Sequence, residues 1–221
     1  MKNFGLTDLW LVDPCELSKE AFYMATHAKD VVESATIVAT TREAVADLTT
    51  VIGTTARKRT SDAHDLYTPR EAAQAYPRAG TGLMFGTETS GLSNEDLDYC
   101  QAYVKIPTGE FSSLNLAQAV NLICYEFFVT HVDAGKTELP EDIATREDVE
   151  DLHDYFLNVA DYVGYIQPDA RGKVDHMYRR IFDRARLTRR EVQALWGLWR
   201  QVMWATDHKP RTNKNENGDT V

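Results

Sequence analysis

The sequence predicts an α/β fold in which a parallel β-sheet is followed by a small all-helical C-terminal extension. Over residues 1–135, short apolar or β-branched runs alternate with helical patterns, as in parallel sheets whose strands are joined by helices. Glycine-containing loops follow three of these runs, and no strand pattern occurs after Pro140. We therefore expect a sheet domain at 1–135, a helical domain at 136–208 and a disordered tail at 209–221.

Four elements are expected in the first quarter of the chain. Leu9–Asp13 is a short apolar run that ends in Asp-Pro and predicts a strand. Ser18 can cap a helix that continues to Lys29. Arg42–Leu48 predicts another short helix, and Thr49–Gly53 is rich in β-branched residues, which favours a strand.

The middle of the chain contains two more strand patterns and a long helix. Gly82–Gly86 and Ala102–Pro107 are short apolar runs typical of buried strands. Leu116–Thr130 predicts a strongly apolar helix. The composition changes at Asp133–Pro140, which we interpret as a linker to the helical domain.

The C-terminal part is predicted to be helical without strands. Its helical patterns are Arg146–Ile166, Val174–Ala185 and Thr188–Thr206. Three tryptophans recur at near-helical spacing and are expected to pack in a core rather than to stack on bases: Trp196, Trp199 and Trp204. Lys209–Val221 is polar with Pro and Gly, which predicts disorder.

Charge divides sharply within this helical part. Residues 138–169 contain ten acidic residues and one basic residue, whereas residues 171–200 contain nine basic and three acidic residues. Two interpretations stay open. The two groups can be solvated faces that pair with each other, or the basic group can contact phosphates through Arg179, Arg180, Arg184, Arg186, Arg189 and Arg190.

The whole-chain composition excludes several classes of protein. The chain carries 24 basic and 34 acidic residues, a formal net charge of −10, which excludes a uniformly basic nucleic-acid binder but not a local basic surface. Three well-separated cysteines, without CxxC or HExxH spacing, favour neither a disulfide framework nor a metal site, and fit a reducing cytoplasm. No apolar run approaches the roughly 18 residues of a membrane span. Because 19 acids are aspartates and only nine basic residues are lysines, we consider a halophilic archaeal source.

Three loops follow predicted strands and are candidates for one binding site. They are Gly53-Thr54-Thr55, FGTETSGL at Phe85–Leu92 and IPTGEFSSLNLAQAV at Ile106–Val120. Open α/β sheets bind ligands at the carboxyl ends of their strands, so the three loops can border one pocket. None matches GxGxxG or GxxxxGK[ST], so the usual dinucleotide and triphosphate motifs are absent.

The content and order of these loops resemble one enzyme family. FGTETSGL resembles the FGxExxGL motif of the SpoU branch of the SPOUT methyltransferases, and the segment around Ser-Leu-Asn resembles that branch's third motif. VIGTTAR is similar to the strand and loop that precede them. The continuation SSLNLAQAVNLICYEF, with the basic YRRIFDRARLTRREVQALWGLWRQ, looks like the TrmJ group, which methylates a ribose 2′-hydroxyl at position 32 of the tRNA anticodon loop.

The resemblance implies a parallel sheet with a C-terminal trefoil knot, a homodimer, S-adenosylmethionine (SAM) as cofactor, tRNA as substrate, a cytoplasmic location and no metal or membrane. By motif matching, SAM contacts fall on Thr54, Thr55, Ala56, Gly86, Ile106, Ser112, Ser113 and Leu114. Candidate catalytic residues are Asn115, Ser113 and Glu88, although Glu88 and Asn115 can instead be caps of a loop or helix. Candidate RNA-binding residues are Arg57, Arg179, Arg180, Arg184 and Arg189.

Two positions depart from the family pattern. The family's first motif, N-x-G-x-x-x-R, supplies an arginine held responsible for activating the 2′-hydroxyl, and Met1 begins inside that motif. We expect the first strand and this arginine to be missing, either because the start is misplaced, which we favour, or because the chain is a non-catalytic RNA-binding or dimerisation module. Thr87 stands where TrmJ-like motifs often carry arginine after Phe-Gly.

Overall fold

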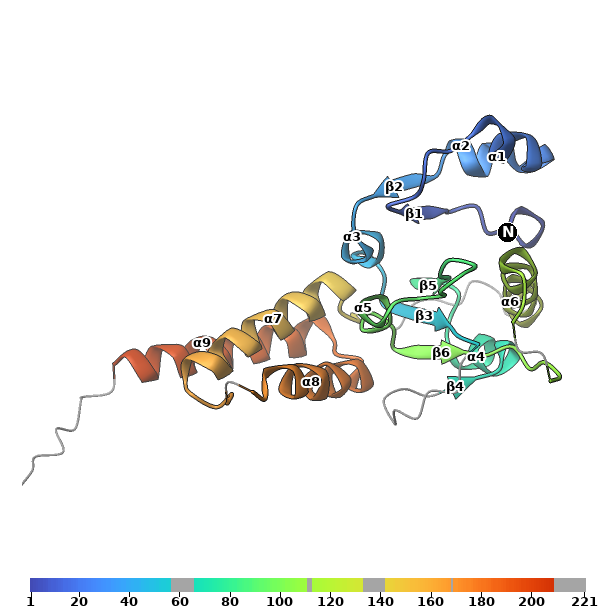
Figure 1. The fold of residues 1–221 in the computed structure, drawn as a ribbon. Coiled ribbons are helices and arrows are strands. Elements are labelled where there is room, and N and C mark those ends of the chain that lie inside the picture. Colours follow the sequence, from blue (N-terminus) through green and yellow to red (C-terminus); the bar gives the residue numbers. More distant parts are fainter. Residues whose placement is uncertain (57–65, 111–112, 133–141, 168, 209–221) are drawn as a thin grey trace, which may run out of the picture.

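The computed structural model of the chain describes residues 1–56, 66–110, 113–132, 142–167 and 169–208 (Figure 1). The predicted linker and tail lie outside the described residues, as do two candidate site residues, Arg57 and Ser112. Between these gaps the chain forms a parallel-sheet part and a C-terminal unit of three long helices. The predicted fold class, a parallel α/β sheet followed by helices, is therefore confirmed, while the knot stays a prediction.

The larger sheet has four parallel strands in the order β4-β6-β3-β5. Its central strand β3 aligns Ile52 with Leu83 on one side and with Ala102 on the other. The predicted strands that begin at Thr49, Gly82 and Ala102 all belong to this sheet. The strands are β3 (Thr50–Thr54), β4 (Leu66–Tyr67), β5 (Thr81–Met84) and β6 (Ala102–Val104).

A second, two-stranded parallel sheet differs from the single sheet that the sequence predicts. β1 (Trp10–Val12) corresponds to the first predicted strand, and it pairs with β2 (Thr36–Val38), which the sequence analysis missed. Among the described residues, β1 and β5 each have only one strand neighbour. The side chains of Trp10 and Val12, which share one face of β1, are exposed. The absence of a first strand from this fold stays a prediction.

The N-terminal helices are shorter than expected. The helix predicted from Ser18 to Lys29 is interrupted at Thr26, whose φ of 47° lies in the left-handed region that non-glycine residues rarely adopt. Ser18 occupies the N-cap position but its side chain makes no capping hydrogen bond. The elements here are η1 (Lys2–Phe4), α1 (Lys19–Met24), η2 (Thr26–Ala28), α2 (Lys29–Glu33) and α3 (Thr41–Val45).

Helices cover both faces of the four-stranded sheet, because alternate β3 side chains point to opposite sides. Ile52 packs with Ile123 and Phe127, whereas Val51 packs with Val45 and Leu97. The first group belongs to a layer formed by α4 and α6, and the second to a layer formed by α3 and α5. The remaining bounds are α4 (Pro69–Ala75), α5 (Asn94–Leu97) and α6 (Leu116–His131).

The C-terminal unit has a core of its own. It consists of α7 (Arg146–Tyr162), α8 (Arg171–Ala185) and α9 (Arg189–Asp207). Trp196 and Trp199 pack against this core as predicted, but Trp204 is 55% exposed and stacks on His208. No helix in the described part of the chain is long and apolar enough to cross a lipid bilayer.

One histidine is buried inside this helical unit. His153 on α7 is 1% exposed, its Nε2 lies 3.2 Å from the Asp175 carbonyl oxygen, and its ring contacts Phe182 edge-on. Burial, followed by the positive charge of Arg179, lowers the pKa of His153 below its ordinary value of 6.5. The neutral imidazole is therefore the form that the folded protein accommodates.

This burial predicts a loss of stability in mild acid. Below about pH 6.5 the unfolded chain takes up a proton at His153 that the folded chain resists, so the free energy of unfolding falls by at most about 1.4 kcal/mol per pH unit. Chemical denaturation between pH 7.5 and 5.5 measures this slope, and His153→Gln should flatten it. His27→Gln, which replaces an exposed histidine, is the matched control. An equal slope of stability against pH in wild type and in His153→Gln would contradict the expectation.

Candidate functional site

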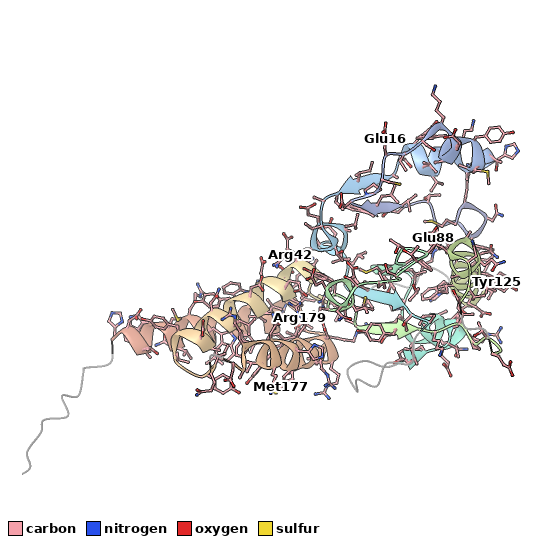
Figure 2. The ribbon with its side chains drawn as sticks, in the orientation of Figure 1. Glu16, Arg42, Glu88, Tyr125, Met177 and Arg179 are labelled. Atoms are coloured by element: carbon pink, nitrogen blue, oxygen red, sulfur yellow. The ribbon has the colours of Figure 1, made fainter. Side chains whose placement is uncertain are left out.

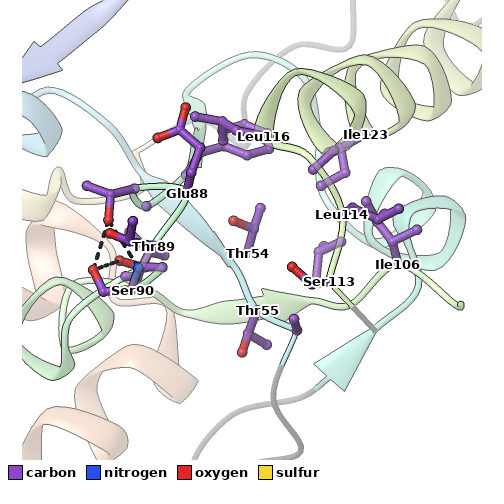
Figure 3. A pocket seen from close by; sticks show the side chains of 18 of the residues that line it. Thr54, Thr55, Glu88, Thr89, Ser90, Ile106, Ser113, Leu114, Leu116 and Ile123 are labelled. Carbon is purple, nitrogen blue, oxygen red and sulfur yellow. Dashed lines mark hydrogen bonds between the residues drawn. The ribbon is translucent and has the colours of Figure 1, made fainter. Parts of the chain in front are cut away.

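A cavity of about 260 Å³ lies at the carboxyl ends of the central strands (Figure 3). The ends of β3, β5 and β6 point away from the C-terminal helices in Figure 1. Because parallel strands end at the same edge of a sheet, the three glycine-containing loops meet there. The cavity is lined by residues of all three: Thr54–Ala56, Phe85–Leu92, and Ile106 with Ser113 and Leu114.

The first wall is the end of β3. Thr54 and Thr55 face the cavity, and the Thr55 N–H donates to the Val104 carbonyl at 3.0 Å, which fixes the loop against β6. Just before them, a Cβ on Gly53 would stand only 2.7 Å from the Cys100 Sγ. Glycine at this position lets the strand pass the buried cysteine. Burial raises the pKa of that thiol, so Cys100 is a packing residue and not a nucleophile.

The second wall is a tight turn after β5. The Gly91 N–H donates to the Thr87 carbonyl at 2.9 Å, and the hydroxyls of Thr87 and Ser90 lie 2.8 Å apart. The turn folds back so closely that a Cβ on Gly86 would stand 2.0 Å from the backbone carbon of Gly91. Thr87 thus stabilises the turn locally, where the family pattern often has an arginine.

The third wall combines the segment after β6 with α6. Ile106, Ser113 and Leu114 line the cavity, and three residues on one face of α6 complete the wall: Leu116, Ala119 and Ile123. These last three were not among the predicted site residues. Their spacing of three and four positions on a predicted helix was the signal that could have identified them.

Asn115 is placed differently from its neighbours. It is the N-cap of α6, and its side-chain oxygen accepts a hydrogen bond from the Ala117 N–H at 2.9 Å. It is not among the residues that line the cavity. The capping alternative therefore accounts for Asn115 in this structure, whereas the candidates Glu88 and Ser113 both line the cavity.

The lining combines an apolar side with a polar side. Figure 3 shows Glu88 across the cavity from Leu114 and Ile106. Glu88 is the one charged side chain among the described lining residues, and hydroxyls come from both threonines of the first loop, the second loop and Ser113. Such a site can hold a flat apolar group against one wall and hydrogen-bond polar groups at the other. The described residues contain no cluster of three or more His, Cys, Asp or Glu suited to a metal ion.

The candidate RNA-binding arginines fall into two groups. Arg184 and Arg189 are exposed, and Arg180 is half-buried. Arg179, in contrast, lies at the junction between the helical unit and the sheet (Figure 2), where it is paired with Glu150 and lies over the Tyr99 ring. Its charge is thus already paired within the protein, and a phosphate contact by Arg179 stays a prediction.

The pairing interpretation of the charge division holds for part of the basic segment, while phosphate contact by the rest stays a prediction. Three cross-helix ion pairs join the acidic and basic segments: Glu150–Arg179, Arg146–Asp183 and, at 2.9 Å, Asp161–Arg171. The exposed Arg184, Arg186 and Arg189 make no such pair among the described residues. Part of the basic segment therefore stabilises the fold, and the rest forms a basic surface around the α8–α9 turn.

Comparisons with known proteins match both parts of the chain. Residues 1–125 match the SpoU rRNA Methylase family, and residues 147–216 match the TrmJ C-terminal domain of tRNA methyltransferases. The tRNA (cytidine/uridine-2'-O-)-methyltransferase TrmJ of Yersinia enterocolitica is 37% identical over 210 residues, which cover 90% of this chain and 81% of the relative. The Pectobacterium atrosepticum enzyme of the same name is 36% identical, covering 94% and 90%. Both organisms are bacteria, so these relatives do not support an archaeal source.

Solved structures agree with the sequence relatives. The crystal structure of TrmJ from Z. mobilis ZM4 matches with a TM-score of 0.79 and 32% identity, covering 92% of this chain and 90% of that chain. A probable methylase family protein from Haemophilus influenzae Rd KW20 matches with a TM-score of 0.56, also at 32% identity, covering 95% and 89%.

The tight turn after β5 predicts a strong effect of one methyl group. Gly86→Ala should lower the free energy of unfolding by about 2 kcal/mol and deform the second wall, because the added carbon meets backbone that cannot rotate away. Urea denaturation measures the loss. Gly109→Ala is the matched control, since a Cβ there has open space around it; equal stabilities of the two variants would refute the expectation.

Proposed function

The chain belongs to the SpoU rRNA methylase family, and on that premise we propose that it transfers a methyl group from SAM to a ribose 2′-hydroxyl of tRNA, at position 32 of the anticodon loop. The observation that carries the proposal is the convergence of the three motif-bearing loops on one cavity. The names of the TrmJ relatives support the choice of tRNA and of the 2′-oxygen. We extend the proposal to a homodimer that acts in the cytoplasm.

The residues of the cavity fit a SAM-like group. Its apolar wall offers Ile106, Leu114 and the α6 face to an adenine ring, and its hydroxyls can bond a ribose and an amino-acid head group. Gly86 removes side-chain bulk where the backbone doubles back beside the cavity. The residues assigned to SAM within the described chain are Thr54, Thr55, Ala56, Gly86, Ile106, Ser113 and Leu114.

The chain's own residues have two tasks in this reaction. When bound, SAM supplies an activated methyl group on its sulfonium. The lining residues would hold the ribose of the tRNA nucleotide so that its 2′-oxygen lies in line with that methyl carbon, which lowers the orientational entropy cost of the transfer. Transfer of that methyl group to the 2′-oxygen of the substrate would break the carbon–sulfur bond of SAM, and the hydroxyl proton would have to pass to a neighbouring group. Among the described lining residues, Glu88 is the group that can accept it, with Ser113 as a hydrogen-bond partner.

The basic surface gives a large substrate a second contact. Arg184, Arg186 and Arg189 are exposed around the α8–α9 turn, away from the cavity. A net charge of −10 disfavours general attraction to an anionic RNA, so a local basic surface is the part of this chain that can contact phosphates. Recognition of an anticodon loop would add contacts to unstacked bases.

The direct test is transfer of labelled methyl from SAM to unmodified tRNA, followed by nucleoside analysis, in low and in high salt. We expect a 2′-O-methylated nucleoside at position 32. SAM binding without transfer would contradict the catalytic proposal and support the non-catalytic RNA-binding alternative. Failure to bind SAM at all would overturn both.

The position of Glu88 predicts a specific kinetic defect. Glu88→Gln keeps the shape of the side chain but cannot take up a proton, so methyl transfer should fall about 100-fold while the dissociation constant of SAM changes little. Single-turnover transfer and equilibrium SAM binding measure the two quantities. Glu95→Gln on α5, an exposed site outside the cavity, is the control. Unchanged transfer in Glu88→Gln would remove Glu88 from the catalytic residues.

The exposed arginines predict a salt effect on tRNA binding. Replacing Arg184 and Arg189 by Ala should weaken binding and reduce the slope of log K against log salt by about one for each phosphate that the protein no longer neutralises. Filter binding between 50 and 200 mM salt, about the range in which such slopes are measured, gives the value. Arg42→Gln, which removes a cation paired with aspartates, should leave the slope unchanged. An unaltered slope in the double variant would leave both arginines as structural charges.

A further inference from the structure

The helical unit is attached to the amino-terminal edge of the sheet, opposite the cavity. The first turn of α7 donates to carbonyls of the turn before β3: the Arg146 N–H to Leu48 at 2.7 Å and the Glu147 N–H to Ala46 at 3.1 Å. A second hollow of about 210 Å³ lies at this junction, between the start of β3 at Thr50 and the end of α8 at Arg184. Backbone bonds thus hold one end of α7 to the sheet. Backbone bonds also join the α8–α9 turn to the segment before α7, from Ala144 N–H to Leu187 and from Arg189 N–H to Asp142, so contacts between α8 itself and the sheet come from side chains.

Gln101 is the side chain that links the sheet to α8. Its Oε1 accepts from the Val51 N–H at 2.7 Å, while its own backbone N–H donates to the Val51 carbonyl at 2.9 Å. Its Nε2 donates to the Tyr99 carbonyl at 2.9 Å and to the Asp183 carboxylate at 3.1 Å. The side-chain amide of Gln101 therefore makes hydrogen bonds to the central strand β3, to the turn before β6 and to α8.

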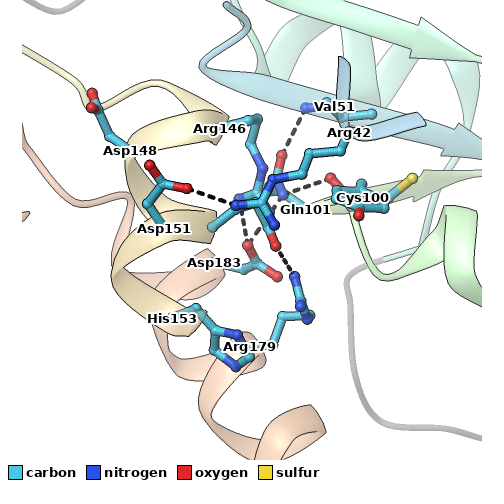
Figure 4. Close-up of polar contacts among 12 residues, drawn as sticks. Arg42, Val51, Cys100, Gln101, Arg146, Asp148, Asp151, His153, Arg179 and Asp183 are labelled. Carbon is cyan, nitrogen blue, oxygen red and sulfur yellow. Dashed lines mark hydrogen bonds and ion pairs between the residues drawn. The ribbon is translucent and has the colours of Figure 1, made fainter. Parts of the chain in front are cut away.

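Asp183 in turn belongs to a buried ion cluster (Figure 4). Arg146 donates to Asp183 at 2.7 Å and also pairs with Glu150, which is paired with Arg179. The side chains of Arg146, Glu150 and Asp183 are only 2–3% exposed. The cluster balances two cations with two carboxylates, so each charge depends on its neighbours, and removal of one partner leaves a buried charge uncompensated.

A surface ion pair crosses the same junction and offers a comparison. Arg42 on α3 pairs with Asp151 and Asp154 of α7 at 2.7 and 2.8 Å, but its side chain is 37% exposed. Solvent screens such exposed pairs and makes them weak. The bonds of Gln101 and Asp183 are part-buried, so solvent screens them less than the Arg42 pairs, and they link the sheet directly to α8.

We propose that Gln101 is a positioning residue: with Asp183 it fixes the helical unit in one orientation on the sheet and so holds the basic surface in register with the cavity. Asp183 is followed directly by Arg184, and Arg186 ends α8 with a φ of 47°, so a bond to Asp183 also places these arginines. The expected effect on tRNA binding rests on the function proposed above. The expected effect on the orientation of the helical unit does not depend on that function.

The test compares Gln101→Met, which keeps the length and volume of the side chain, with Arg42→Gln. Spin labels are attached to cysteines at Gln74 on α4 and Gln201 on α9, both exposed, in a Cys15→Ser background because Cys15 is the exposed native thiol among three. We expect a narrow distance distribution in the parent and in Arg42→Gln, and a broadened or shifted one in Gln101→Met. In the same variant, KM for tRNA should rise about tenfold, with SAM affinity changed less than about twofold.

The outcomes separate the inference from the proposed function. An unchanged distance distribution in Gln101→Met overturns the inference, and so does a parallel fall of SAM affinity, kcat and thermal stability, which would make Gln101 a general stabiliser. If Gln101→Met does not fold, Gln101→Asn, whose amide is one methylene shorter and cannot span from Val51 to Asp183, takes its place with the same expectation. If the parent methylates no tRNA, the proposed function fails, and the label distances alone decide the inference.

Discussion

The pairing of β3 with a parallel strand on each side is the constraint on which the rest of the structure depends. Through Ile52, β3 is hydrogen-bonded to β5 and β6 in register, so the three strands begin at one edge and end at the other. Their ends bring three loops that are distant in sequence to one cavity. Their beginnings form the platform to which Gln101 and the first turn of α7 attach the helices. Site and attachment are therefore two results of one arrangement of strands.

The parts of the fold predicted from sequence are those whose signals are local. The β-branched run at β3 and the helical pattern of α9 were recognisable because strand propensity and helical spacing act within a few residues. The break at Thr26 and the pairing of β2 were missed, since a left-handed residue and a three-residue strand depend on tertiary contacts. In the site, the three motif-bearing loops already indicated most of the residues on the polar side of the cavity. The α6 wall and the capping role of Asn115 became clear only when the helix was placed beside the cavity.

The charges show most clearly what composition leaves undecided. Arg179 and Arg184 lie five positions apart on one helix, yet the first is half-buried and paired with Glu150, and the second is exposed. Helical spacing places them on different faces but does not state which face meets the sheet. In the folded protein, the face of α8 that carries Asp183 and Arg179 meets the sheet, where Asp183 accepts from Gln101 and Arg179 lies over Tyr99. The same segment therefore stabilises the protein with one face and leaves cations free for a ligand on the other.

The placement of the cavity and the basic surface at opposite edges of the sheet also sets a minimum size for any ligand that uses both. β3 alone has five residues, which place its first and last Cα atoms about 13 Å apart. A ligand that occupies the cavity therefore meets Arg184 only if it also extends along the sheet to the far edge. On the proposed function, this separation favours a structured RNA, which is long enough to extend past the sheet, over a free nucleoside.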